Sequence, residues 1–266
     1  MFYYKVTIAY KGTAYSGWQA QALDNAHEKN PTVQGVVQKA LNKVTKYQAF
    51  SLSGASRTDA GVHARSQLAR IALEHEIPAK RLQMAMNAQL PDDVQLMHCE
   101  PCSQQFNPHT ISSVKEYHYY FSLSQLTNPV FNDIVGCELG HPLDKFSHQE
   151  RFEKMTEACR LFVGTHDFQN YCNKDKKTVS TVRTVTKCDI HSANFSPLGE
   201  NIYYIKICSN GFLRYMVRFI VGALFEVFKG RVELEDISNY LNSYQSKRLS
   251  LKAKSKGLHL ISITTK

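Results

Sequence analysis

The stretch Phe2-Tyr-Tyr-Lys-Val-Thr-Ile-Ala-Tyr10 sets the starting point of the fold. Every second residue from Phe2 to Tyr10 is a large apolar one, and smaller or polar residues occupy most of the positions between them. Apolar residues that alternate in this way are typical of a β-strand with one buried face. The chain therefore opens with a strand, and the rest of the fold can be followed outward from it.

The segment after this strand predicts a helix. Apolar residues from Val33 to Val44 follow helical spacing behind Pro31-Thr32, and Thr32 is a plausible N-cap. The same reasoning predicts strands at about 50–55 and 67–73, a helix at 79–86 and a strand at 94–98. The first half of the chain thus has the order β-α-β-β-α-β.

A second cycle begins at Tyr117-His-Tyr-Tyr-Phe-Ser-Leu123, whose alternate residues share a strand face. Further elements are predicted as a helix at 152–162, strands at 182–190 and 202–208, an amphipathic helix at 213–224, a short helix at 234–241 and a final strand at 258–263. No repeat of residues is visible, so the duplication is one of architecture. We expect an α/β (α+β) fold of two ferredoxin-like halves with mainly antiparallel sheets around a central cleft.

The boundary between the halves is expected near residue 105. Residues 1–105 would form an N-terminal half that carries the loop between the strands at 50–55 and 67–73. Residues 106–266 would form a C-terminal half that carries the Tyr117 strand and the 213–224 helix. No stretch rich in Gly, Pro or Ser separates the two.

The balance of charge favours a nucleic-acid partner. The 266 residues include 32 Lys and Arg against 23 Asp and Glu, a net charge of +9, and such an excess attracts a polyanion. The lysine-rich stretches 174–177 and 247–256 are either solvated surface or contacts to a phosphate backbone. The longest apolar run, Phe219 to Phe225, is too short to span a bilayer, so no membrane partner is expected.

Cysteine usage favours a reduced, cytoplasmic protein. The seven cysteines are odd in number and irregular in spacing, and the first residues begin a strand rather than resemble a signal peptide. Cys99 and Cys102 form one CxxC next to His98. A closed zinc site needs four ligands, and no second pair follows at a suitable spacing, so no metal is predicted.

The connection Ser53-Gly-Ala-Ser-Arg-Thr-Asp-Ala-Gly-Val-His-Ala-Arg65 is the strongest candidate site. Asp59 can simply close a turn in which Gly61 supplies a positive φ angle. Alternatively it is a reactive carboxylate, because an acid beside Arg57 and His63 in a basic protein calls for a chemical role. No second acid lies nearby, so a glycosidase site of two carboxylates is poorly supported.

Other candidates also have two interpretations. Arg214 and Arg218 lie one turn apart at the edge of an apolar helical stripe, where they either face solvent or meet a carboxylate. Tyr117 is either a core aromatic or a ring that stacks on a flipped base. For Trp18, the only tryptophan, anchoring in the core is favoured over base stacking.

Several short motifs occur in a fixed order along the chain. They are Tyr10-Lys-Gly-Thr with Gly17-Trp-Gln-Ala-Gln, Thr32-Val-Gln, Arg57-Thr-Asp-Ala-Gly-Val-His-Ala, Lys115-Glu-Tyr-His-Tyr, Gly164-Thr-His-Asp-Phe, Phe212-Leu-Arg-Tyr-Met-Val-Arg with Gly222, and Gly257-Leu-His-Leu. In this order they resemble the tRNA pseudouridine synthase A family, from the first strand to the last. The most specific of them is Arg57-Thr-Asp-Ala-Gly-Val-His-Ala.

The resemblance implies an isomerase with the pseudouridine synthase fold, usually a homodimer. Its substrate would be uridine at positions 38 to 40 in the anticodon stem-loop of tRNA, with no cofactor and no metal. By motif, Asp59 would be the catalytic carboxylate and Arg57 would fill the space left by the flipped uridine. Tyr117 would pack on the base, and Arg218 would pair with Asp59.

Arg65 and Arg214 would contact RNA. Three positions depart from the family pattern: Ser56 replaces a common glycine, His109 a usual arginine and Lys254 a frequent proline. Because a histidine is shorter than arginine and largely neutral at pH 7, the substrate range can differ. Two alternatives stay open, a non-catalytic RNA-binding protein, which gives Asp59 no role, and a synthase that acts on another RNA.

Overall fold

The computed structural model describes residues 1–20, 31–123, 128–136, 147–174, 178–195 and 199–265. The chain divides into two compact units, Met1–Ser113 with His259–Lys266 (unit 1) and Val114–Leu258 (unit 2). The boundary thus lies later than the expected one after residue 105. The last strand also belongs to unit 1, although its place in the sequence put it in the C-terminal half.

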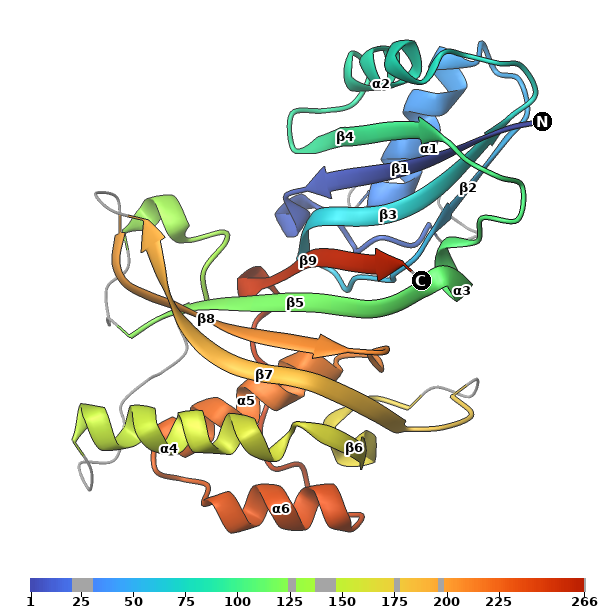
Figure 1. The fold of residues 1–266 in the computed structure, drawn as a ribbon. Helices are drawn as coiled ribbons and strands as arrows, with labels where there is room; N and C mark the ends of the chain where they lie inside the picture. The colour runs from blue at the N-terminus through green and yellow to red at the C-terminus, as the bar shows by residue number, and fades with distance from the viewer. Residues whose placement is uncertain (21–30, 124–127, 137–146, 175–177, 196–198, 266) are drawn as a thin grey trace. The chain divides into compact units, whose positions relative to one another are not determined.

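Unit 1 has the predicted β-α-β-β-α-β order (Figure 1). Its main elements are β1 (Phe2–Tyr10), α1 (Val33–Val44), β2 (Phe50–Gly54), β3 (His63–Leu73), α2 (Ala79–Asn87) and β4 (Val94–Pro101), with the short helices η1 (Gly12–Ala14) and α3 (Pro108–Ile111). The strands β4, β1, β3 and β2 neighbour one another in that order, and every pair is antiparallel. This is the ferredoxin-like arrangement that the sequence predicts.

Strand β9 (Leu258–Thr265) extends the sheet of unit 1. It runs parallel to β3, with His63 opposite His259 and Ala64 opposite Leu260. Since these partners are far apart in sequence, no local pattern could have placed β9 beside β3.

Helices α1 and α2 lie on the same side of this sheet (Figure 1). Val37 and Leu41 of α1 and Leu82 of α2 are fully buried, as is Ile8 of β1. The hydroxyl of Thr32 accepts a hydrogen bond from the amide of Gly35, which confirms the predicted N-cap. The apolar face of each helix therefore forms the core of unit 1.

Unit 2 is built on four strands that pair antiparallel to one another. Its elements are β5 (Ser112–Ser122, which begins at the end of unit 1), η3 (Pro129–Phe131), α4 (His148–Leu161), β6 (Gly164–Asp167), η4 (Phe168–Tyr171), β7 (Val182–Phe195), β8 (Gly199–Ser209), α5 (Met216–Phe228), α6 (Leu234–Asn242) and η5 (Ser255–Gly257). The strand order is β5-β8-β7-β6. The short strand β6 was not predicted, because Gly-Thr-His-Asp has no apolar alternation.

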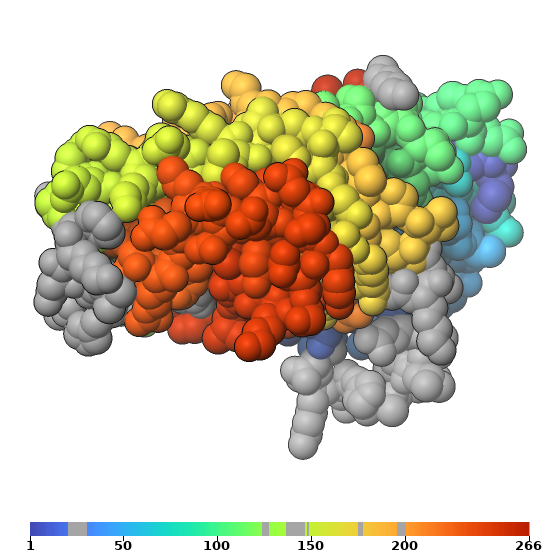
Figure 2. Space-filling model, turned by 90° about the horizontal axis from the view of Figure 1, so that it is seen from below, coloured from blue at the N-terminus to red at the C-terminus, as the bar shows by residue number. Residues whose placement is uncertain are grey.

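Helix α5 provides the core of unit 2. The ring of Phe225 packs against Tyr119 and Phe121 of β5, with ring centroids 5.7 and 5.3 Å apart. Helices α4 and α6 lie outside it and form much of the surface seen in Figure 2. No helix among the described residues has the length and apolar character to cross a membrane.

Helix α5 begins later than the sequence pattern indicates. The pattern starts at Leu213, whereas the helix starts at Met216. Tyr215 adopts a left-handed backbone conformation, φ 63° and ψ 6°, which cannot continue a right-handed helix toward the N-terminus. Arg214 consequently lies in the turn before the helix, and the expectation that Arg214 and Arg218 share one helical face was wrong.

Candidate active site

The loop that carries Asp59 is shorter than the sequence suggested. It spans residues 55–62 between β2 and β3, so His63 and Arg65 lie on the strand. Strand β3 starts early because Ala64 is paired with Tyr10 of β1 as well as with β9. Long-range pairing, rather than local pattern, fixes the end of the loop.

Asp59 does form the predicted turn. The amide of Val62 donates to the carbonyl oxygen of Asp59 at 3.1 Å, and Gly61 has φ 76°. The turn is therefore closed by the backbone of Asp59 and its side chain is not needed for it. The residue as a whole is half-buried, so the turn and a chemical role for the carboxylate are compatible.

Thr58 anchors the loop just before Asp59. Its hydroxyl lies 2.8 Å from the hydroxyl of Tyr10, and its carbonyl oxygen accepts from the amide of Trp18 at 3.1 Å. Trp18 is 1% exposed, which confirms that it is a core anchor and not a base-stacking platform. The segment after β1 thus fixes one side of the Asp59 loop.

The other side of the loop is held by Gly61, whose amide donates to the carbonyl of Tyr15 at 3.1 Å. Gly17 has φ 102°, and a Cβ atom there would lie 2.5 Å from the carbonyl oxygen of Thr58. Only a residue without a side chain fits this approach and this backbone conformation. The backbone on both sides of Asp59 is therefore set by contacts with residues 15–18.

Buried polar side chains secure both ends of the connection. Gln67, fully buried, accepts from the amide of Ser56 at 3.2 Å and donates to the Ser56 carbonyl at 2.6 Å. His63 is 3% exposed; its Nδ1 accepts from the amide of Gly12, and its ring stacks on His259. His63 thus supports the loop from within the fold, while Ser56 fits despite replacing a common glycine.

Two cations accompany Asp59 on this stretch. Arg57 and Arg65 are both exposed. Within the described part of the chain, neither guanidinium forms an ion pair with a carboxylate. Unit 1 therefore presents one half-buried carboxyl group and two exposed cations on a rigid support.

In unit 2, Tyr117 lies on β5 and is 5% exposed. Its ring meets Phe212 edge-on, with centroids 5.2 Å apart and an interplanar angle of 87°. The side chain is therefore packed with other aromatics, as its strand pattern indicates, and a contact with a base remains a proposal.

Arg218 lies in the first turn of α5, half-buried. Its Nε donates to the carbonyl of Ala253 at 2.6 Å. The Cζ atoms of Arg214 and Arg218 lie 4.9 and 5.5 Å from the ring centroid of Tyr215. Thus the two predicted arginines meet through the ring between them and not along one helical face.

The sequence interpretation missed two residues at this place. Tyr215 was not singled out, although an aromatic between two arginines is a known pattern in nucleic-acid binders. Lys252 was noted only as part of a lysine-rich stretch, yet its Nζ lies 4.0 Å from the centroid of the Tyr215 ring. No spacing in the sequence links these two positions, so only the fold could bring them together.

The predicted site residues therefore fall into two groups. Unit 1 carries Arg57, Asp59 and Arg65, and unit 2 carries Tyr117, Arg214 and Arg218. Two of the three departures from the family pattern lie outside both groups: His109 is exposed in α3, and Lys254 is exposed just before η5.

The CxxC pair does not form part of a metal centre among the described residues. No group of three or more His, Cys, Asp or Glu side chains is placed there to hold a metal ion. Burial raises the pKa of the Cys99 thiol to about 11. The thiol is thus protonated at neutral pH.

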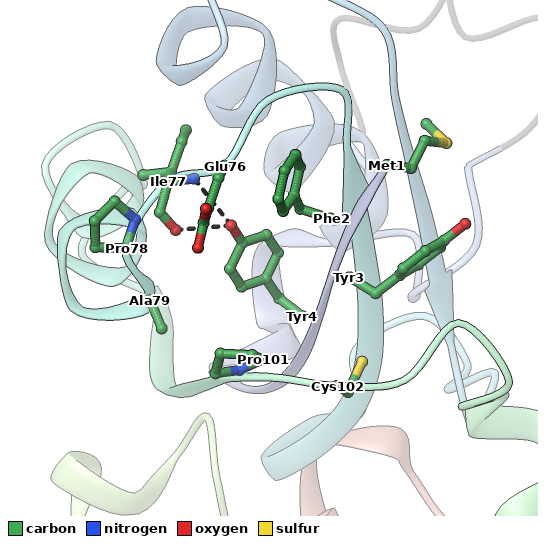
Figure 3. A pocket seen from close by; sticks show the side chains of 10 residues that line it. All are labelled: Met1, Phe2, Tyr3, Tyr4, Glu76, Ile77, Pro78, Ala79, Pro101 and Cys102. Carbon is green, nitrogen blue, oxygen red and sulfur yellow. Dashed lines mark hydrogen bonds between the residues drawn. The ribbon is translucent and has the colours of Figure 1, made fainter.

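A cavity of about 290 Å³ lies at the start of β1 (Figure 3). It is lined by Met1, Phe2, Tyr3, Tyr4, Glu76, Ile77, Pro78, Ala79, Pro101 and Cys102. The hydroxyl of Tyr4 donates to the carbonyl of Ile77 at 2.7 Å and accepts from its amide. The cavity lies at the opposite end of β1 from the Asp59 loop, and no predicted site residue lines it.

Comparison with known proteins shows the family to which the chain belongs. The family model described as tRNA pseudouridine synthase matches residues 6–109 and 158–264. The chain belongs to the tRNA pseudouridine synthase A family. A relative named tRNA pseudouridine synthase A 2, from Desulfotalea psychrophila, is 47% identical over 263 residues, 99% of this chain and 98% of the relative.

Other members of the tRNA pseudouridine synthase A family match over nearly the full length as well. The tRNA pseudouridine synthase A 1 of Protochlamydia amoebophila is 34% identical over 99% of this chain and 96% of its own. That of Acetivibrio thermocellus is 32% identical, with 97% and 98% covered. A chain in a crystal structure of a Cbf5-Nop10-Gar1 complex aligns with a TM-score of 0.38 and 10% identity over 97% of this chain and 48% of that chain.

Membership confirms the resemblance found in the sequence motifs. Enzymes of this family are isomerases that convert uridine to pseudouridine in tRNA. The activity therefore follows from the family.

Proposed function

We propose that this protein isomerises uridine to pseudouridine at positions 38 to 40 in the anticodon stem-loop of tRNA, with Asp59 as the catalytic carboxylate. The observation that carries the proposal is the Asp59 loop. Its turn is closed by the backbone, and its neighbours are held by residues 10–18 and Gln67. A carboxylate on so rigid a support is suited to chemistry that depends on accurate placement.

The reaction suits a site with a single acid. The bond from N1 of uracil to C1′ of the ribose breaks, the base turns, and a bond from C5 to C1′ forms. The proton that leaves C5 is balanced by one gained at N1, so no atom is lost and no redox step occurs. One ionised carboxylate, acting as a nucleophile at C1′ or as a base toward a sugar proton, is sufficient.

The other residues serve the flipped base and the RNA. Arg57 would fill the space that the base leaves, Tyr117 would pack on the base, and Arg218 would pair with Asp59 and keep it ionised. The exposed Arg65 and Arg214 would contact phosphates. In this division unit 1 contributes Asp59 and Arg57, and unit 2 contributes Tyr117 and Arg218.

The cellular compartment and the oligomeric state follow from the same proposal. A tRNA-modifying enzyme with reduced thiols would act in the cytoplasm, and two copies would form a homodimer. The described cysteines are all free, which is compatible with a reducing compartment.

The test compares Asp59→Asn and Asp59→Ala with the unaltered protein on an unmodified tRNA transcript. Joining the base through C5 expels the hydrogen there, so release of tritium from 5-labelled uridine measures the reaction directly. Both variants are expected to lose turnover by at least about 10⁴-fold while they keep tRNA binding. Asp189→Asn, which removes an exposed carboxylate on β7, is the matched control.

Because pseudouridine and uridine have the same mass, the product is mapped by mass spectrometry after a carbodiimide label has been attached selectively to pseudouridine. Pseudouridine at positions 38 to 40 supports the proposal, whereas conversion only in another RNA favours the alternative of a different substrate. Substantial turnover by Asp59→Asn would show that a different group is catalytic.

A further inference from the structure

A cluster of three cations surrounds one aromatic ring in unit 2. The ring belongs to Tyr215, and the cations are Arg214, Arg218 and Lys252, at 4.9, 5.5 and 4.0 Å from the ring centroid. We call these four residues the Tyr215 cluster. They come from two separate segments, the start of α5 and the chain that leads to η5.

The segment that carries Lys252 is fixed against α5. The amide of Ala253 donates to the carbonyl of Arg218 at 2.9 Å, and Nε of Arg218 donates back to the carbonyl of Ala253. A Cβ atom on Gly222 would lie 2.0 Å from the carbonyl oxygen of Leu251, so this segment rests directly on the helix backbone. Lys252 is therefore held in place by main-chain contacts on either side.

Tyr215 ties the cations together. Its hydroxyl accepts a hydrogen bond from a terminal nitrogen of Arg214 at 3.0 Å, while its ring face attracts positive charge. The left-handed backbone of Tyr215 is uncommon for a tyrosine and costs free energy. A strained aromatic at this point is explained if its ring holds the surrounding cations in position.

Among the described residues, the two exposed cations of the cluster have no carboxylate partner. Arg214 and Lys252 are exposed, and no carboxylate of the described residues forms an ion pair with either. Like charges gathered around one ring repel one another, and the ring offsets only part of that repulsion. An anion bound to either exposed cation would reduce it.

We propose that the Tyr215 cluster binds backbone phosphates of tRNA, with Lys252 and Arg214 as the contacts and Tyr215 as the positioning residue. The inference rests on the proposed function for the identity of the RNA. A phosphate fits better than a base, because the ring already has cations over it and the groups that face solvent are charged.

The test measures equilibrium binding of an unmodified tRNA transcript to the full-length protein over a series of KCl concentrations. Lys252→Gln should raise Kd about five- to tenfold at low salt and reduce the slope of log K against log[salt] by about 0.7 to 0.9. Lys80→Gln is the matched control, since it removes an exposed lysine from α2. Its slope should remain that of the unaltered protein.

Variants of Tyr215 separate the effect of its ring on tRNA binding from the effect of its backbone conformation. Tyr215→Asn keeps a residue type that tolerates the left-handed conformation but removes the ring, so it should weaken binding as much as Lys252→Gln. Tyr215→Phe keeps the ring and loses only the bond from Arg214, so most of the affinity should remain.

Three results would overturn the inference: unchanged Kd and salt slope in Lys252→Gln, an equal loss in Lys80→Gln, or unaltered binding in Tyr215→Asn. Since Lys252 lies on the surface, Lys252→Gln decides the matter even if a Tyr215 variant fails to fold. The tritium-release assay on the unaltered protein is separate. Its failure would refute the proposed function, whereas normal turnover with unchanged binding of the variants would refute the cluster alone.

Discussion

Gly17→Ala tests whether the segment after β1 positions Asp59. The new Cβ would lie 2.5 Å from the carbonyl oxygen of Thr58, where ordinary contact begins at 3.4 Å, so these atoms must separate by 0.9 Å. The contacting atom belongs to the backbone, which cannot rotate away as a flexible side chain can. Relief therefore has to shift the loop next to Asp59, or the segment that holds it.

The magnitude follows from this displacement. A catalytic group displaced by about 1 Å loses roughly 100-fold in rate. The positive φ of 102° at Gly17 adds a backbone cost of about 1–3 kcal/mol in the free energy of unfolding. Since domains have about 5–15 kcal/mol in total, the variant should remain folded.

The assay is tritium release from tRNA in a single turnover at saturating enzyme, with thermal unfolding measured in parallel. The expected result is a rate about 100-fold lower and a Tm lower by roughly 2–4 °C for each kcal/mol lost. Gly211→Ala is the control, because its Cβ would lie 3.6 Å from Nε of Arg183, an ordinary contact. A folded Gly17→Ala protein with an unaltered rate would refute the argument that this contact positions Asp59.

Two further predictions concern unit 2. Arg218→Ala should slow the single-turnover rate about 100-fold. Arg218→Lys should slow it about tenfold, because lysine keeps the charge but not the planar group that donates to Ala253. Equal rates in the two variants and the unaltered protein would contradict the proposed role of Arg218. Burial raises the pKa of Glu116, but hydrogen bonds from Lys206 and His118 outweigh it, and the net pKa lies below its ordinary value. The stability that this carboxylate contributes is thus present above the ordinary pKa and lost as pH falls through the lowered one. Glu116→Gln should therefore lower the free energy of unfolding by about 1 kcal/mol at pH 7, as measured by urea titration. The difference between the two proteins should shrink below about pH 4. A difference that stayed constant with pH would contradict this account.

The sequence by itself determined the family and most elements of both units. The alternation from Phe2 to Tyr10 and the cap at Thr32 are local signals, since each depends only on neighbouring residues. The motif around Asp59 is likewise contiguous, so it could be recognised without the fold. Where the local signal was weak, prediction failed, as in β6, which has no apolar alternation.

Only the tertiary structure decided which distant residues meet. It paired β9 with β3, set Gly17 against Thr58, and brought Lys252 to the ring of Tyr215. It also moved the start of α5 from Leu213 to Met216, because the left-handed backbone of Tyr215 prevents the helix from extending further toward the N-terminus. Periodicity reports which face of an element is buried, but not which segment covers it. Contacts between segments far apart in sequence arise from packing of the whole chain, and the support of Asp59 and the Tyr215 cluster depend on such contacts.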